Sequence, residues 1–560
     1  MTSPREAMAR PRHTHRLLQL IQLLRLVLVL GAVPVAAQES VAGGASAGGA
    51  LERYLRAAEV AGVVTPHPTW GVRGLTDREL RRMLAGAKAH PWQGRAALGD
   101  TLPPWGVAVR LLPVTARAVF NSAFPFDGEA GGHDGPVWAG RGLTSSLQAG
   151  AVLRAGPLTV QLAPTYFRAE NRPFDLAPTL ESGDGVYRNE LTSNTTDQPQ
   201  RFGNTPYARL DPGQSFARLD VWRFTAGVSS AAQLWGGGDR VPLMFGPSAG
   251  GFPHAFVGTE RPLELGVAGL QWRLIAGRPQ HSAWSPTTRD RLLTGGVVVI
   301  TPRPLPGLEL GFGRLSHDWW PERLTLRALA KPLTPNMSAG TGDAGADGNG
   351  LATAFVRWAP RGAGLELWGE FLRIDGAANL RTLLVEYDDL AGQAMGIRRA
   401  WRSANGTRLT VLRAEGYRTV SGHRERGGAR LGNAYIGYNP EQHSAILQGH
   451  THHGQTLGSP GVHGGLGHIV GIDRYAPGGM LTVEWEQRLV RDRNSVVGGL
   501  VPGPGVNMEV QHAAGLSFSR FWSQFELLGG ARLVLHVNRH LSARTVPNLN
   551  LHAGLRARFP

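Results

Sequence analysis

The sequence predicts an all-β, antiparallel membrane barrel of about 18 strands, with a small α-helical segment at its N-terminus. Three observations predict this fold class: an N-terminal secretory signal, no later apolar run long enough for a transmembrane helix, and long strands whose apolar and polar side chains alternate. A barrel distributes its membrane-facing surface over alternate residues, so a mean hydropathy of −0.16 is compatible with a membrane protein.

Residues 1–37 have the three parts of a secretory signal peptide. Four arginines among the first 16 residues precede an apolar run over residues 17–33, and small residues end the segment at Ala37. Arg25 and two glutamines leave the run short of the roughly 20 apolar residues that a transmembrane helix needs, so an uncleaved signal anchor is the weaker alternative. We expect cleavage after Ala37 and a flexible, Gly- and Ala-rich leader at residues 38–49.

Residues 50–98 are predicted to form a periplasmic helical segment. Apolar residues recur near helical spacing over residues 51–62, and Thr76-Asp77-Arg78-Glu79 is a capping box that opens a second helix. The intervening residues 63–68 contain two prolines and separate the two helices. Because so short a hairpin cannot bury a core alone, we expect it to dock against the rest of the chain.

Residues 103–560 are predicted to form the barrel, because segments with a period of two replace the helical pattern. The last segment is the clearest, with Leu549, Leu551, Ala553, Leu555, Ala557 and Phe559 on one face and Asn548, Asn550, His552, Gly554, Arg556 and Arg558 on the other. An amphipathic strand of this length, with an aromatic residue near its end, is typical of a tilted membrane strand. We expect its apolar face to contact lipid and its polar face to look onto water inside the barrel.

The same alternation recurs at residues 158–162, 481–489 and 524–537, and more weakly at residues 365–374 and 510–520. At about 25 residues per strand and connection, the roughly 455 residues available give about 18 strands. An even number places both termini in the periplasm, which makes residues 538–547 an outer loop. The long polar stretches 176–212 and 332–350 are also expected to be outer loops.

Composition narrows the classes of function and partner. The chain has no cysteine, which excludes disulfides, thiolate metal sites and cysteine catalysis. The formal charge of +16 falls to +12 once the five arginines and one glutamate of residues 1–37 are removed. Its arginines are spread singly over an exported chain, so we expect no nucleic-acid partner. We expect instead an acidic or capsular polysaccharide, or the phosphates of lipopolysaccharide, because guanidinium groups pair with carboxylates and phosphates. A genome that favours arginine codons is the alternative explanation of this charge.

Two patterns could carry chemistry. Residues 246–250 match G-x-S-x-G, but a nucleophile elbow needs a helix directly after Ser248, which Gly250, Gly251 and Pro253 prevent. Histidines are dense at His443, His450, His452, His453, His463 and His468. Glu441 is the only carboxylate close to them in sequence and neutral histidine suits a polar wall or loop, so we expect no metal or other cofactor. A His443-Ser444 catalytic pair is disfavoured because neighbours on a strand point to opposite faces.

The helical segment and several later blocks resemble the Wzi family of capsule assembly proteins. These blocks are residues 55–64, 69–72 and 75–80, then 121–125, 134–142 and Pro164, and finally 235–238, 251–254 and 449–458. Gly71 stands where the family commonly has proline. The resemblance implies an outer-membrane barrel of about 18 strands with a periplasmic helical bundle, which holds capsular polysaccharide at the cell surface without catalysis.

The resemblance transfers no binding residue to this chain. From the strand pattern we take Arg141, Arg532, Arg556 and Arg558 as candidates for polysaccharide binding, with lumen solvation and ion pairing across the wall as their alternative role. A porin-like channel for anionic solutes is the second hypothesis for function, and an outer-membrane hydrolase is the third. We expect a monomer that contacts outer-membrane lipid and lipopolysaccharide.

Overall fold

The structure, a computed structural model, describes residues 47–93, 106–126, 135–179, 181–188, 196–246, 248–333, 348–374, 380–385, 391–419, 446, 448–458, 466–492 and 508–558. These residues belong to one compact unit. The predicted signal peptide at residues 1–37, most of the leader at residues 38–49, and Phe559 lie outside them.

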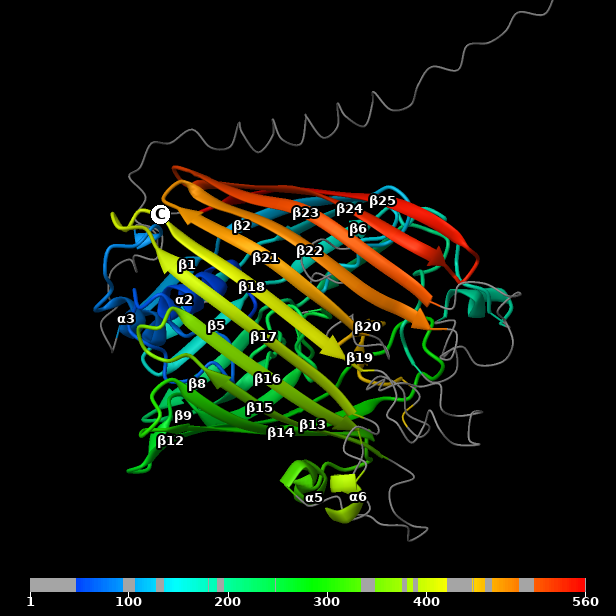
Figure 1. Cartoon of the computed structure of the whole chain (residues 1–560). Helices are drawn as coiled ribbons and strands as arrows, with labels where there is room; N and C mark the ends of the chain where they lie inside the picture. Colours follow the sequence, from blue (N-terminus) through cyan, green and yellow to red (C-terminus); the bar gives the residue numbers. More distant parts are fainter. Residues whose placement is uncertain are drawn as a thin grey trace, which may run out of the picture. The chain divides into compact units, whose positions relative to one another are not determined.

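Among the described residues, 23 strand segments form one antiparallel sheet, which Figure 1 shows running obliquely side by side, and two short strands form a separate hairpin. The first twelve are β1 (Val107–Leu111), β2 (Val114–Asn121), β3 (Gly142–Gln148), β4 (Ala151–Ala155), β5 (Leu158–Leu162), β6 (Thr165–Ala169), β7 (Tyr207–Asp211), β8 (Phe216–Val221), β9 (Phe224–Ser229), β10 (His254–Thr259), β11 (Leu263–Glu264) and β12 (Ala268–Gly277). The others are β13 (Arg291–Pro302), β14 (Leu308–Trp319), β15 (Gly348–Trp358), β16 (Leu365–Ile374), β17 (Ala391–Arg402), β18 (Leu409–Arg418), β21 (Leu466–Ala476), β22 (Gly479–Asp492), β23 (Met508–Trp522), β24 (Phe525–Arg539) and β25 (Arg544–Ala557).

Five of these segments continue the segment before them. Two to four residues separate β1 from β2, β3 from β4, β5 from β6 and β7 from β8, while β10 and β11 pair with the same strand, β12. When each interrupted pair is counted as one strand, the 23 segments become 18 strands, the number expected from the sequence. The segment count is higher because five strands are interrupted. Three of the bends contain a proline, Pro113, Pro164 or Pro212, which has no N–H to donate to the ladder, and the fourth contains Gly150.

Gly150 shows why one bend requires glycine. A Cβ at this position would lie 1.9 Å from the carbonyl oxygen of Leu162 on the neighbouring strand, which no side chain could tolerate without a backbone shift. The hydrogen-bond ladder is interrupted along the four bends. The sheet nevertheless brings its N- and C-terminal strands together, because β2 pairs with β25 on one side and with β3 on the other.

Connections differ sharply between the two ends of the sheet. At the end of the sheet where β1 begins and β25 ends, two to six residues join successive strands, whereas at the other end most connections have 13 to 47 residues. This asymmetry is typical of outer-membrane barrels, whose periplasmic turns are short. The loop predicted at residues 538–547 is shorter than expected. Strands β24 and β25 extend into it and leave only residues 540–543 between them. The predicted loops 176–212 and 332–350 likewise include β7 and the start of β15.

The expected alternation of side chains is confirmed in β25. Leu549 and Leu551 are 42% and 40% exposed on the outer face, whereas Asn548 and Asn550 are fully buried on the inner face. The expectation that the inner face looks onto water is wrong for these residues. Asn550 donates to Asn121 Oδ1 at 2.9 Å and to Phe126 O at 2.5 Å, because the connection after β2 folds inward over the wall.

The N-terminal segment contains the two predicted helices, α2 (Ala50–Val60) and α3 (Asp77–Leu84), and α3 begins with the predicted capping box at Thr76 and Glu79. Both helices pack against the inner face of the wall through a buried cluster that includes inward residues of β17, β18 and β21. In this cluster Trp92 stacks on Tyr54 at 4.4 Å and meets Tyr475 edge-on at 5.1 Å. Within the described part of the chain, no helix is long and apolar enough to cross a membrane.

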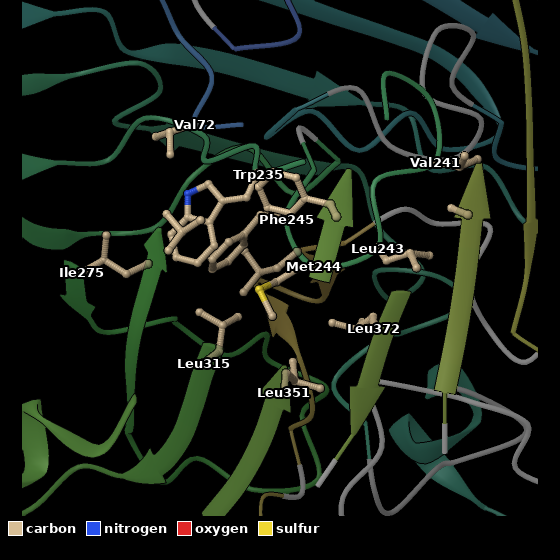
Figure 2. Packing of buried hydrophobic residues seen from close by; sticks show 14 of the residues in the cluster. Val72, Trp235, Val241, Leu243, Met244, Phe245, Ile275, Leu315, Leu351 and Leu372 are labelled. Atoms are coloured by element: carbon tan, nitrogen blue, oxygen red, sulfur yellow. The ribbon is translucent and has the colours of Figure 1, made fainter. Parts of the chain in front are cut away.

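Two further segments fill the inside of the barrel. The first is the lumen loop, residues 230–253 without residue 247, whose Trp235, Met244 and Phe245 pack on inward side chains of the wall such as Leu315 (Figure 2). The second is the lumen hairpin, residues 448–458, which contains β19 (Thr451–His452) and β20 (Gln455–Thr456). Short helical segments occur in the long connections as η1 (Gly183–Tyr187), α5 (Leu326–Leu329), η2 (Lys331–Leu333) and α6 (Leu380–Val385).

Candidate functional site in the lumen

A fully buried arginine joins α2 to both the wall and the lumen loop. Arg56 Nη2 donates to Glu366 Oε1 of β16 and to Gly237 O of the lumen loop, each at 2.7 Å. Its Nη1 pairs with Asp239 Oδ1 at 3.0 Å. Buried ions are tolerated only when partners compensate the loss of water, so this contact fixes the three elements in one relative position.

Other ion pairs surround Arg56 and form what we call the anchor network: Arg56, Arg73, Arg357, Arg398, Glu52, Glu309, Glu366 and Asp239. Arg357 and Arg398 contact Glu366 at 2.7 and 2.5 Å. Burial opposes the charge of Asp239, but Arg398, Arg73 and Arg56 outweigh burial and hold the pKa of Asp239 well below its usual range. Asp239 therefore stays ionised within the network at neutral pH.

A neighbouring cavity contains cations that are already paired. Glu484 of β22 binds Arg240 at 3.0 Å, Arg413 at 2.5 Å and Arg532 at 2.8 Å. These three arginines line the cavity together with Arg53 and with Arg398, which belongs to the anchor network. Because Arg240, Arg398, Arg413 and Arg532 each have a carboxylate partner, most of the positive charge around this cavity is already compensated.

The lumen hairpin carries the only grouping of metal-ligating side chains found among the described residues. Donor atoms of Asp211, His452 and His453 lie within 4.8 Å of one another. However, His452 Nδ1 accepts the backbone N–H of Gln280 at 3.0 Å, so the neutral ring carries its proton on Nε2, and Arg209 Nη2 lies 3.4 Å from Asp211 Oδ2. Both contacts oppose a bound cation. The grouping is better explained as the polar contact between the hairpin and β7.

Burial also keeps the hairpin histidines uncharged. It lowers the pKa of His450 to about 4 and that of His453 to about 3, against a weaker opposing effect of backbone hydrogen bonds. His450 Nε2 shares a 2.7 Å hydrogen bond with Met244 O of the lumen loop. His450 thus acts as a neutral hydrogen-bonding group that connects the two lumen segments, whereas His452 bonds to Gln280 outside the lumen loop. His443 and His463 lie outside the described residues.

A second cavity lies between the N-terminal segment and the wall and has about 680 Å³ of open space. Residues from five strands, from the N-terminal segment and from the lumen loop line it, including Arg73, Gln161, Arg218, Gln233, Phe256 and Arg273. Arg273 forms no hydrogen bond or ion pair with any described residue, and its guanidinium lies 5.5 Å from the ring centre of Phe256. This cavity therefore differs from the first in having a cation without a carboxylate partner.

The structure does not bring the four predicted binding arginines together. Arg141 lies just beyond the end of β2, where its Nε donates to Ser122 O at 3.1 Å. Arg556 and Arg558 lie at the C-terminal end of β25, where they pair with Glu526 at 3.0 and 3.4 Å. Arg532 pairs with Glu484. The ion pairs match the alternative role that the sequence left open, and a role of these arginines in binding stays a prediction.

Sequence reasoning did not single out Arg273 or the anchor network. A signal for Arg273 existed, because Leu270, Trp272 and Leu274 alternate with Gln271 and Arg273 as in a membrane strand. The lumen segments carried a different signal. The blocks 235–238, 251–254 and 449–458, which support the family resemblance, all lie in or directly beside the lumen loop and the lumen hairpin.

The whole arrangement can be compared with a solved structure, that of Wzi, which is described as an outer-membrane protein involved in group 1 capsule assembly in Escherichia coli and as a carbohydrate-binding β-barrel. The TM-score is 0.61 with 15% identity, over 92% of this chain and 99% of that chain. The fold is that of Wzi. At such low identity the likeness concerns the fold alone, and at that level it confirms the resemblance expected from the sequence.

Two other solved structures show a weaker likeness. Pseudomonas aeruginosa OccK1 (OpdK) has a TM-score of 0.34 and 10% identity over 80% of this chain and 98% of that chain. Acinetobacter baumannii OccAB4 has a TM-score of 0.37 and 8% identity over 82% of this chain and 100% of that chain. These scores are too low to carry an argument about this protein. No family model and no curated protein matches the sequence.

Proposed function

We propose that the mature chain is a non-enzymatic protein of the outer membrane that binds exported polysaccharide and holds it at the cell surface during capsule assembly. The observation that carries this proposal is the likeness to Wzi over 92% of the chain. The apolar outer face supports the membrane location, since Leu549 and Leu551 would be costly to expose to water on a soluble protein. We place the short connections and the helical segment on the periplasmic side.

The filled lumen favours binding over transport. Helices α2 and α3, the lumen loop and the lumen hairpin occupy the inside of the barrel, and two buried apolar clusters join them to the wall. The anchor network adds ion pairs that would have to break before these segments could leave. A porin-like channel for anionic solutes, the alternative function, would need a continuous polar path that these segments obstruct.

Catalysis has less support. Ser248 is buried in the lumen loop, and no hydrogen bond joins it to a histidine within the described residues. The segment after Ser248 leads into β10 without a helix, so the geometry of a nucleophile elbow does not form. We therefore assign no reaction to the protein.

The proposal can be tested with the purified mature chain in detergent. Binding of the capsular polysaccharide of the encoding strain, and of charged and neutral glycans, would be measured across ionic strength. Binding that weakens as salt screens the charges would support an acidic glycan, and absence of binding to every glycan would refute the function. Steady anion-selective openings in planar bilayers would instead favour the channel.

A further inference from the structure

We propose that the cavity around Arg273 is a binding subsite for a uronic acid residue, that is, a sugar carrying one carboxylate. This inference rests on the proposed function and adds to it the chemical class of sugar and the place where it binds.

The register of the strands explains how the cavity forms. On the inner face, Arg273 of β12 lies opposite Gly258 of β10, and Phe256 of β10 lies opposite Gly227 of β9. Gly227 in turn faces Arg218 of β8. Gly258 and Gly227 therefore lie among Arg273, Phe256 and Arg218 on the inner face. Because these two glycines have no side chains, the wall is hollowed at this place.

Gly227 is required by the backbone as well as by the cavity. A Cβ at this position would lie 2.1 Å from Ala217 O and 3.0 Å from the Cα of Arg218. At Gly258 a Cβ would lie 2.4 Å from Trp272 O. The close approach of strands at both positions keeps this part of the inner face free of side chains.

The guanidinium groups are oriented by aromatic rings. Arg273 lies over Phe256 at 5.5 Å and Arg218 over Phe216 at 5.4 Å. A planar guanidinium that rests on a ring keeps its hydrogen-bonding edge available and loses little further freedom when it binds a carboxylate. Arg273 Nε is buried and has no hydrogen-bond partner, which a bound carboxylate would supply.

The charges around the cavity favour a single negative charge. Arg218 pairs with Asp220 at 3.1 Å, and Arg73 pairs with Glu52 and Asp239, so these cations are compensated. Arg273 is repelled by Arg218 and attracted from a distance by Glu79 and Asp220, but forms an ion pair with neither carboxylate. About one positive charge remains, which suits a carboxylate better than a phosphate monoester of nearly twice the charge.

Amide groups supply contacts for sugar hydroxyls. Gln161 Nε2 donates to Gln214 O at 2.7 Å, and Gln233 Nε2 shares a 3.3 Å hydrogen bond with His254 Nε2. These contacts fix both amides and leave the carbonyl oxygen of each without a hydrogen bond to any described residue. Fixed acceptors beside a guanidinium and a phenyl ring match the hydroxyls, carboxylate and C–H face of a uronic acid.

The test compares trigalacturonic acid with uncharged maltotriose, by calorimetry on the purified mature chain. Arg273→Gln should weaken binding of trigalacturonic acid about ten-fold or more, because a charge-assisted pair is lost, and should leave maltotriose binding unchanged. Arg273→Lys should weaken it less. Arg303→Gln is the matched control, since it removes the same charge from an exposed pair with Glu264 and should change neither affinity.

Each outcome is decisive. Trigalacturonic acid binding that survives in Arg273→Gln, or equal affinity of the wild type for both probes, overturns the subsite and leaves the proposed function standing. Failure of the wild type to bind any glycan overturns both. Thermal melting in detergent accompanies each titration, and Arg273→Lys, which keeps the charge, carries the test if Arg273→Gln does not fold.

Discussion

Glu366→Gln is the substitution that most directly tests how the helical segment is held in the lumen. Glu366 is fully buried and accepts hydrogen bonds from Arg56 of α2 and from Arg357 and Arg398 of the wall. Glutamine keeps the shape of the side chain but removes the negative charge at the centre of three guanidinium groups. Those groups then lie buried with too few carboxylates.

The expected cost follows from the geometry. Removing one partner of a buried ion pair typically costs about 3–5 kcal/mol, because the remaining charge stays out of water. Arg56 keeps Asp239 at 3.0 Å, so we expect the lower part of this range for the release of α2. At 1.4 kcal/mol per factor of ten, about 3 kcal/mol corresponds to a roughly hundred-fold larger population of undocked helix.

Hydrogen exchange measures this population directly. Amides of α2 should exchange on the order of a hundred times faster in Glu366→Gln, whereas amides of β24 and β25 should exchange as in the wild type. Glu264→Gln removes an acidic group from the exposed pair with Arg303 and should leave α2 unaffected. Exchange of α2 within about three-fold of the wild type in Glu366→Gln would refute the anchoring role, since that ratio corresponds to well under 1 kcal/mol.

Three further outcomes are expected. Burial lowers the pKa of His67, but the nearby Glu79 outweighs burial, so the pKa of His67 is raised overall. Burial raises the pKa of Glu79, but His67 outweighs burial, so the pKa of Glu79 is lowered overall. The stability that His67 contributes is lost as pH rises through its raised pKa, and the stability that Glu79 contributes is lost as pH falls through its lowered pKa. Protection of α3 in hydrogen exchange should therefore be greatest between the unfolded pKa values of about 4.5 and 6.5. A maximum above pH 8 would contradict this. Leu551→Arg, at the middle of β25, should destabilise the membrane-inserted barrel by about 2–4 kcal/mol in urea titrations in lipid, and a change below about 0.5 kcal/mol would mean that this face does not contact lipid. The wild type should be nearly silent in planar bilayers, whereas deletion of residues 50–93 should produce openings; frequent large openings of the wild type would be inconsistent with a filled lumen.

The fold could be predicted from the sequence because its main signal is local. In β25 alternate residues lie on the exposed outer face, so the apolar Leu549 and Leu551 indicate the strand and its orientation without knowledge of any partner. The capping box at Thr76 is local too, and it begins α3 where expected. The bends at Gly150 and Pro212 escaped prediction because they depend on how neighbouring strands approach one another.

The site could not be predicted in the same way, because it depends on contacts between residues far apart in the chain. Arg56 and Glu366 are 310 residues apart in sequence, and nothing local distinguishes either from a solvated charge. The polar face of its strand makes Arg532 a candidate for polysaccharide binding, yet its contacts depend on Glu484, which is distant in the sequence. Arg273 becomes distinctive only when the structure reveals that its neighbours lack a carboxylate within reach.

The most direct test of the proposed function uses the encoding strain itself. The gene would be deleted, and polysaccharide bound to the cells would be measured separately from polysaccharide released into the medium. Loss of the cell-bound polymer with a matching rise in the medium is the predicted result, and re-expression of the full chain should reverse it. An unchanged amount of cell-bound polymer in the deletion strain would contradict a role in holding polysaccharide at the surface.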